Sequence, residues 1–151
     1  MFIIDMQGFY CMKSFVPKEV AICSLENDQI AHFVLNPPVN TYPDAKSQNY
    51  LELYHHGINW DSGFVPYEYL QNILTDIIKY DDKVACKGLE KCRFIAKLLN
   101  KHIYDMDLMG CPKLSTLKTP EVKCLFHNGL YFHCSLQNIH VLKLWMLQQK
   151  L

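Results

Sequence analysis

The kind of sheet that this chain can build is set by two apolar runs, Val20-Ala21-Ile22-Cys23-Ser24-Leu25 and Ile30-Ala31-His32-Phe33-Val34-Leu35. Both runs have the length of a strand and contain β-branched side chains, which favour a buried strand. The polar tetrad Glu26-Asn27-Asp28-Gln29 lies between them and has the composition of a hairpin turn. We therefore predict two antiparallel neighbours, the second of which ends at Asn36-Pro37-Pro38 because proline cannot continue a ladder.

The segments on either side of this hairpin add strands and helices. Phe2-Ile3-Ile4 predicts a buried strand that delivers Asp5 to its end before Gly8 breaks it. Residues 39–63 are expected to be irregular, with one short helix near 50–54. Beyond them the predicted elements are a helix from Pro66 to Lys79, a strand at Lys83–Lys87, a helix after Gly88, a strand at His102–Met106 and a last helix from near Ser135. This order predicts an α/β fold, in which helices pack on the faces of a mixed five-stranded sheet.

Length and composition are those of one globular unit. A chain of 151 residues buries roughly two-thirds of its unfolded surface, so residues 1–151 are expected to form a single domain. Half of the residues are apolar and the formal net charge is zero, which favours a packed core over disorder. Neutrality also argues against binding to nucleic acid through net charge, so any such binding would need a local patch.

The lack of a recognisable signal peptide or membrane span, together with the pattern of cysteines, favours an intracellular protein, cytoplasmic or nuclear. No stretch approaches the length of a membrane span, and residues 1–5 lack the basic head and long apolar run of a signal peptide. The seven cysteines are odd in number and scattered. Without a secretion signal, this pattern favours reduced thiols and metal binding over a disulfide framework.

Three of the metal-binding side chains that we expect lie close together near the C-terminus. Cys124 and His127 are three positions apart, so one tight turn can present both to a single cation, and Cys134 follows at the head of the last helix. Thiolates and imidazoles in such an arrangement are typical of tetrahedral zinc sites, because Zn²⁺ is borderline-soft. A fourth ligand remains open. The alternative is that the cysteines are ordinary core residues and His127 a loop residue, and His133 could replace one ligand.

The order of elements, with its residues, resembles the RNase H-like 3′–5′ exonucleases of the DEDDh group. Five segments match motifs of that group in the right sequence: Ile3–Gly8, Glu19–Ala21, Asn36-Pro37, His56–Asn59 and His133–Asn138. They are similar to the opening Asp-x-Glu strand, the start of the second strand, the proline that ends the third, the His-Gly-Ile-Thr that follows it and the final His-x-x-x-x-Asp. The resemblance covers nearly the whole chain and implies an RNase H-like sheet.

The same resemblance implies a degenerate catalytic centre. In the DEDDh group four carboxylates hold two divalent metals that activate water, and a histidine serves as general base. The corresponding positions in this chain are Asp5, Gln7, Cys92, His133 and Asn138. Only Asp5 keeps a carboxylate, and neutral amides cannot balance two hard cations. Conventional two-metal exonuclease activity is therefore not expected.

The chain also resembles one branch of this group, the domain of the Maelstrom proteins, in the positions that depart from the exonuclease pattern. That domain lacks the acidic tetrad and carries a zinc ion bound by Glu, Cys, His and Cys. Its pattern of Pro-x-Glu-[Ile/Val]-[Gly/Ala], Cys-x-x-His and a later Cys matches Pro17–Ala21, Cys124–His127 and Cys134. The resemblance therefore implies a structural zinc bound by Glu19, Cys124, His127 and Cys134, which holds the last helix to the second strand.

Two functions follow as expectations. The resemblance implies a module that binds or weakly cleaves RNA, in small-RNA or transposon control. A basic stripe could contact phosphates of single-stranded RNA, or could be a solvated helix face; it consists of Lys87, Lys91, Arg93, Lys97 and Lys101. The alternative is an inactive scaffold for a protein partner or a homodimer, which the broadly apolar segment Val141–Leu147 mildly favours.

Overall fold

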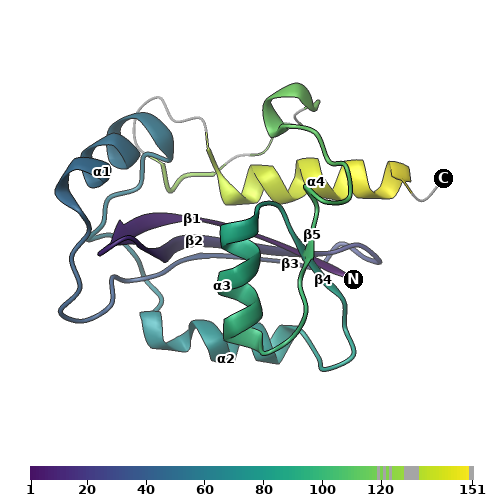
Figure 1. Ribbon diagram of the computed structural model, residues 1–151, viewed down its shortest axis with the longest axis horizontal. Coiled ribbons are helices and arrows are strands. Elements are labelled where there is room, and N and C mark those ends of the chain that lie inside the picture. The colour runs from purple at the N-terminus through teal and green to yellow at the C-terminus, as the bar shows by residue number, and fades with distance from the viewer. Residues whose placement is uncertain (119, 121, 123, 128–132, 150–151) are drawn as a thin grey trace.

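The protein folds into a five-stranded mixed sheet flanked by helices (Figure 1). The computed structural model describes residues 1–118, 120, 122, 124–127 and 133–149. The strands are β1 (Phe2–Cys11), β2 (Ser14–Ser24), β3 (Ile30–Val34), β4 (Val84–Cys86) and β5 (Tyr104–Asp105). The helices are α1 (Ala45–Tyr50), which runs into the π-helical turn Leu51–His55, a 3-10 turn (Tyr67–Tyr69) leading into α2 (Leu70–Ile77), α3 (Leu89–Leu99), a 3-10 turn (Leu114–Thr116) and α4 (Ser135–Gln149).

The strand order is β3-β2-β1-β4-β5. β1, β2 and β3 pair antiparallel, whereas β4 and β5 run parallel to β1. The predicted hairpin is confirmed, and its turn is closed by the amide of Ser24, which donates to the carbonyl of Gln29 at 3.1 Å. The predicted mixed sheet is confirmed as well.

The first strand is longer than its sequence predicts. β1 runs through Gly8 to Cys11, so the prediction that Gly8 breaks the strand is wrong. Gln7 pairs with Glu19 and Gly8 with Pro17, which leaves Lys18 as the extra residue of a β-bulge. A Cβ atom on Gly8 would lie 2.2 Å from the carbonyl oxygen of Val16. The glycine therefore permits the close approach of two backbones at the bulge.

Other elements also differ from their predicted bounds. β2 begins at Ser14, six residues before the predicted start at Val20. The short helix expected near 50–54 begins earlier, at Ala45, and the helix expected to reach Lys79 ends at Ile77. The fifth strand covers only Tyr104–Asp105, because the carboxylate of Asp105 accepts the amide of Asp107 at 2.9 Å and turns the chain.

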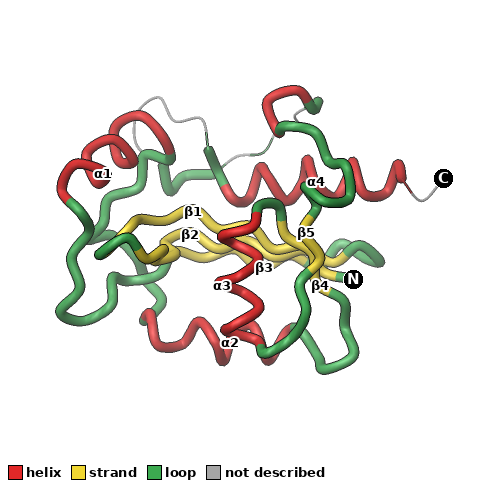
Figure 2. The backbone as a smooth tube through the Cα atoms, viewed as in Figure 1, coloured by secondary structure: helices red, strands yellow, loops and turns green. Residues whose placement is uncertain are grey.

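Helices cover both faces of the sheet (Figure 2), and the alternation of side chains along the central strands separates two cores. Ile4 and Ile22 point to the face covered by α2 and α3, whereas Ile3 and Ala21 point to the face covered by α4. Ile139 of α4 is completely buried there, which contributes about 1.5–3 kcal/mol. By the same alternation Asp5, Gln7 and Glu19 point toward α4. The polar residues of interest thus share one face of the sheet.

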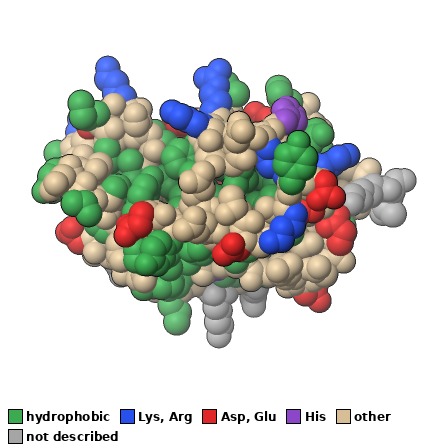
Figure 3. Space-filling view, turned by 90° about the horizontal axis from the view of Figure 1, so that it is seen from below, with side chains coloured by type: hydrophobic (Ala, Val, Ile, Leu, Met, Phe, Trp, Pro, Cys, Tyr) green, Lys and Arg blue, Asp and Glu red, His purple; other side chains and the backbone are tan. Residues whose placement is uncertain are grey.

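The surface carries both signs of charge. Figure 3 views the molecule from the side on which α2 lies in Figure 1, and on that face Lys and Arg side chains are interspersed with Asp and Glu. This agrees with a chain that has 15 basic and 15 acidic residues. Within the described residues, no helix combines the length and the apolar character that a membrane span requires.

Candidate functional site

Glu19 is the buried centre of the site. It follows the bulge in β2, and its side chain is 0 % exposed. Its Oε1 accepts the backbone amide of Ser135, at the first residue of α4, at 2.7 Å, and the hydroxyl of Ser135 donates to the carbonyl of Glu19 at 3.3 Å. A carboxylate at a helix N-terminus is stabilised by the free amides and the helix dipole. Glu19 therefore joins β2 to the start of α4.

The other oxygen of Glu19 faces the side chains of the three remaining ligand candidates. Its Oε2 lies 3.1 Å from Nε2 of His127, 3.5 Å from Sγ of Cys124 and 3.6 Å from Sγ of Cys134. The ligand atoms of these four residues all lie within 4.8 Å of one another. Ligands of a tetrahedral zinc ion are separated by about 3.3–3.8 Å, given the usual bond lengths. The four residues named from the sequence thus come together, and the cluster could hold a metal ion.

The orientation of His127 suits a metal ligand. Its Nδ1 is hydrogen-bonded to the carbonyl oxygen of His56, which leaves Nε2 directed at the cluster. A backbone acceptor on one ring nitrogen fixes the tautomer and presents the other nitrogen to a cation. The carbonyl of His56 thereby positions Nε2 of His127, a residue far along the chain.

Contacts within the cluster shift the pKa values of its residues. The thiol of Cys134 donates to Cys124, which with the bonds to His127 and His32 lowers the pKa of Cys124 to about 4 and raises that of Cys134. Burial lowers the pKa of His127, but hydrogen bonds to Cys124 and Glu19 outweigh it and raise the pKa to about 10. Burial likewise opposes ionisation of Glu19, yet His127 and His32 hold its pKa well below the usual range. Without a cation, the protonated rings of His127 and His32 balance the charges of Glu19 and Cys124, and Cys134 stays a neutral thiol.

His32 is a fifth member that the sequence reasoning missed. Its Nε2 lies 2.8 Å from Oε2 of Glu19 and 3.9 Å from Sγ of Cys124, and its ring packs against Phe126. Burial is outweighed by the bonds to Cys124 and Glu19, so the pKa of His32 rises to about 9. The signal available in the sequence was an imidazole in an otherwise apolar strand. In the structure His32 pairs with Ala21, which places its side chain diagonally opposite Glu19 on the same face of the sheet.

A second polar centre surrounds Asp5, which is 2 % exposed. Its Oδ1 lies 2.9 Å from the ammonium of Lys91, and its Oδ2 accepts the amides of Asn138 at 2.9 Å and Gln7 at 3.4 Å. Burial lowers the pKa of Lys91, but the Asp5 carboxylate more than offsets this, so the pKa is raised and the lysine is charged. The ammonium of Lys91 therefore neutralises the buried carboxylate of Asp5.

The two centres are neighbours. Gln7 of the Asp5 centre is paired directly with Glu19 across the sheet. Cys134 and Asn138 lie one turn apart at the start of α4, where the amide of Asn138 donates to the carbonyl of Cys134 at 2.9 Å. One helical turn thus covers both centres.

Comparisons with known proteins add no family. No protein-family model matches the sequence, and no curated protein matches it significantly. Function is therefore inferred from the residues and their geometry.

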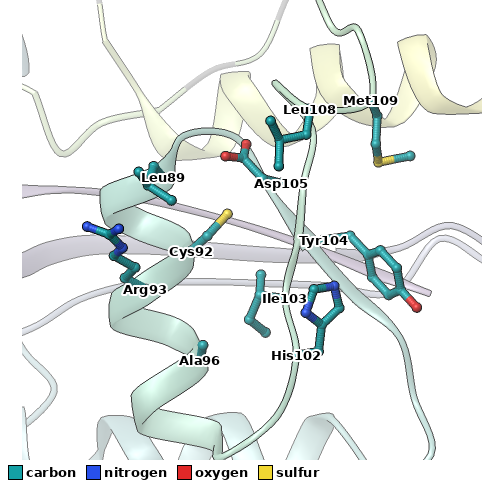
Figure 4. A pocket seen from close by; sticks show the side chains of 10 residues that line it. All are labelled: Leu89, Cys92, Arg93, Ala96, His102, Ile103, Tyr104, Asp105, Leu108 and Met109. Carbon is teal, nitrogen blue, oxygen red and sulfur yellow. The ribbon is translucent and has the colours of Figure 1, made fainter.

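The side chain that meets Asp5 from α3 is Lys91 rather than the aligned Cys92. The thiol of Cys92 lies 3.4 Å from the carbonyl of Cys86 and lines a hollow of about 360 Å³ between α3 and β5. Figure 4 shows Cys92 among the side chains that line that hollow, between α3 and the segment that carries His102 and Tyr104. Successive residues of a helix point about 100° apart, so an alignment uncertain by one residue selects a different face.

His133 lies beside the Asp5 centre and is not one of the four residues that could hold a metal ion. Its ring stacks on that of His55, with centroids 3.8 Å apart and planes 15° apart. Burial and the charge of Lys91 lower the pKa of His133, and burial with the neighbouring His133 lowers that of His55 to about 4. Both rings are therefore neutral at pH 7. Together with Lys91 they line a hollow of about 250 Å³.

The predicted basic stripe is divided in the structure. Lys87 pairs with Asp107, Lys91 with Asp5, and Lys101 donates to backbone carbonyls of the loop after α2, including that of Lys79 at 3.1 Å. In the described part of the chain, Arg93 and Lys97 have no ion pair. Three of the five basic residues thus stabilise the fold, and contact with phosphates stays a prediction for the other two.

Proposed function

We propose that this chain is a Maelstrom-like, degenerate relative of the RNase H-like DEDDh exonucleases, and that it binds single-stranded RNA without two-metal hydrolysis. The observation that carries the proposal is the ion pair of Asp5 with Lys91, 2.9 Å apart, beside the Glu19 cluster. The strand order and directions support the RNase H-like relationship, because three antiparallel strands are followed by two parallel ones joined through helices. A role in small-RNA or transposon control belongs to the same proposal.

The metal of the Glu19 cluster is, in this proposal, zinc. Two sulfurs, an imidazole and a carboxylate match the preference of a borderline-soft ion for mixed ligands. Bound by all four residues, zinc would leave no open position for water, so it would stabilise the junction of β2 and α4 and supply no chemistry. His32 would orient the Glu19 carboxylate from outside the four ligands.

The lone carboxylate argues against hydrolysis. Two-metal catalysis requires several anionic oxygens to hold cations about 3.5–4 Å apart. Asp5 already accepts three hydrogen bonds, one of them from a permanent positive charge. A divalent cation would have to displace Lys91 against electrostatic repulsion.

A groove beside α3 supplies a surface for the strand. It measures about 610 Å³, and its lining includes Lys13 and Phe15 from the β1–β2 hairpin and Glu90, Phe94 and Lys97 from α3. The two phenyl rings meet edge to face, with centroids 5.8 Å apart. Aromatic rings and flanking cations are the elements from which proteins build sites for single strands, because every base can stack.

Binding of fluorescent single-stranded RNA, measured by anisotropy with and without EDTA, tests this function. We expect salt-dependent binding that EDTA leaves unchanged and no cleavage on a denaturing gel. Removing one phosphate contact in Lys97→Met should weaken binding several-fold at low salt, whereas Lys83→Met, exposed beside β4, should not. Absence of binding at low salt, or Mg²⁺-dependent cleavage, would contradict the proposal.

The scaffold function remains the second candidate because α4 exposes apolar side chains. Leu144 and Leu147 are 48 % and 38 % exposed and border a hollow of about 450 Å³ that includes Ile30. A stable dimer by light scattering, together with no RNA binding, would favour this candidate.

A further inference from the structure

We propose that the hollow over Lys91 is a metal-independent binding site for a phosphate group. The inference rests on the proposed function, because it assigns a ligand to the centre that has lost its metals. Its ligand class is a phosphate, either free or at the end of a polynucleotide strand. The ammonium of Lys91 would supply the positive charge that divalent ions supply in two-metal sites.

The lining of the hollow selects an anion. Its polar wall consists of Lys91, the stacked imidazoles of His55 and His133, and the amides of Gln7 and Asn138. No carboxylate of the described residues lines it. A cation surrounded by neutral groups that can donate hydrogen bonds attracts a compact anion.

Asp5 offsets part of this charge, but its buried carboxylate does not line the hollow, and both of its oxygens already accept hydrogen bonds. Two amides and the ammonium donate to its oxygens. An ammonium has three N–H donors, and among the described residues Asp5 is the one acceptor of Lys91. The side chain of Lys91 is 25 % exposed, so its remaining donors can reach a ligand.

A second acidic group, Glu90, lies beside the hollow and is also engaged. Glu90 accepts the hydroxyl of Tyr10 at 2.6 Å, and Tyr10 forms part of the wall of the hollow. The carboxylate of Glu90 lines the neighbouring groove instead. The hydrogen bond thus keeps this negative charge beside the hollow and not in it.

Size and position fit a terminal phosphate. The hollow, about 250 Å³, exceeds several times the roughly 30 Å³ of a water molecule but falls below the about 300–1,000 Å³ of most pockets for organic ligands. Phe15 borders both this hollow and the groove with Phe94. A strand in the groove could therefore end with its phosphate over Lys91.

Titration of the folded protein with inorganic phosphate in EDTA, followed by NMR signals of the histidine rings, tests the inference. We expect saturable shifts of His55 and His133, at an affinity of order millimolar for one charge-assisted contact. Lys91→Met should weaken binding by about tenfold or more. Because that variant leaves Asp5 unpaired in the interior, the charge-balanced Asp5→Asn/Lys91→Met variant is the main test.

Lys83→Met is the matched control, since Lys83 is exposed at the opposite end of β1 and should leave phosphate binding unchanged. The inference is overturned if phosphate causes no saturable shift, if EDTA abolishes the shift, or if the double variant binds as tightly as the parent.

A second arm compares RNA strands that carry a 3′-phosphate, a 5′-phosphate or neither. Tighter binding of one phosphorylated strand, lost in the double variant, identifies a strand end as the source; equal binding beside a response to inorganic phosphate identifies the free ion. RNA binding without any phosphate response would overturn the inference and leave the proposed function standing. A phosphate response without RNA binding would support the site and overturn the proposed function.

Discussion

At the scale of single residues, Glu19 connects two kinds of interaction through one carboxylate. One oxygen accepts the first amide of α4, and the other faces the donors of the metal cluster. A buried carboxylate needs such partners, because an isolated charge in the interior is strongly disfavoured. Its neighbours satisfy it with or without a cation, since His127 and His32 supply positive charge when protonated.

Replacing this carboxylate with an amide should weaken both the cluster and the fold. Glu19→Gln removes the anionic ligand and leaves buried positive charge uncompensated, which should lower the free energy of unfolding by about 3–5 kcal/mol. The zinc content should fall well below one ion per chain. Elemental analysis and urea denaturation measure the two effects.

Glu26→Gln is the control for that variant. Glu26 pairs with the N-terminal ammonium at the surface, so its loss should change stability by less than about 1 kcal/mol and leave metal content unaltered. A Glu19→Gln protein that keeps its zinc and unfolds like the Glu26→Gln protein would show that the carboxylate is not a ligand.

At the scale of elements, the bulge in β2 sets which side chains reach α4. Lys18 occupies the extra position, and its ammonium donates to the backbone carbonyls of Trp60 and Ser62. Beyond the bulge the alternation places Glu19, Ala21 and Cys23 toward α4. Without the added residue, the part of β2 before it would be out of phase with β1.

Gly8→Ala should disturb this bulge. The new methyl group would lie 2.2 Å from the carbonyl oxygen of Val16 and 2.9 Å from Cα of Pro17, both backbone atoms. We expect a loss of about 1–3 kcal/mol in the free energy of unfolding, at the upper end of that range because backbone cannot rotate away. Urea denaturation followed by circular dichroism measures it.

Gly110→Ala is the matched control, because its φ is +86° but no atom lies within 4 Å of the added carbon. Backbone strain alone should cost about 1 kcal/mol there. An equal or smaller effect at Gly8 would show that the strands shift apart without cost.

The sequence predicts elements whose signals are local and misses those that depend on a partner. The hairpin at Glu26–Gln29 is predictable because turn composition and flanking strands lie together. The passage of β1 through Gly8 is not, because the bulge that requires glycine belongs to β2. The sequence places Lys91 in a basic stripe that either contacts phosphates or is solvated, and does not predict its pairing with Asp5, since the phase of the helix against Asp5 is fixed only by packing. His32 was missed because strand register is not visible in one strand.

At the scale of the molecule, the cluster joins segments far apart in the chain: β2, the segment around Cys124 and His127, and the start of α4. Bound zinc would favour the folded state by mass action, because the unfolded chain does not preform the site. Burial of Ile139, Leu142 and Trp145 by α4 acts in the same direction. Metal binding and the burial of apolar side chains would thus both stabilise the junction of β2 and α4.

Zinc affinity should depend steeply on pH. In the metal-free protein the pKa values of His127, about 10, and Cys134 are raised, so both groups carry protons at neutral pH. Cys124 and Glu19 are already ionised, because their pKa values are lowered. Zinc must therefore displace about two protons, and the logarithm of its affinity should rise by about two per pH unit between about pH 6 and 8.

Competition with a chromophoric chelator at several pH values measures this slope, and calorimetry in buffers of different ionisation enthalpy counts the protons released. Affinity that is independent of pH would contradict the assigned protonation. Removal of zinc by EDTA should also lower the melting temperature.

The single turn of α4 that carries both Cys134 and Asn138 restricts how this protein can change over evolutionary time. Inserting or deleting one residue between them would rotate one side chain by about 100° relative to the other. Either the thiol or the amide would then miss its target on the sheet. Mutations that lengthen or shorten this segment should therefore disrupt one of the two centres, whereas exchanges of side chains in place need not disturb both.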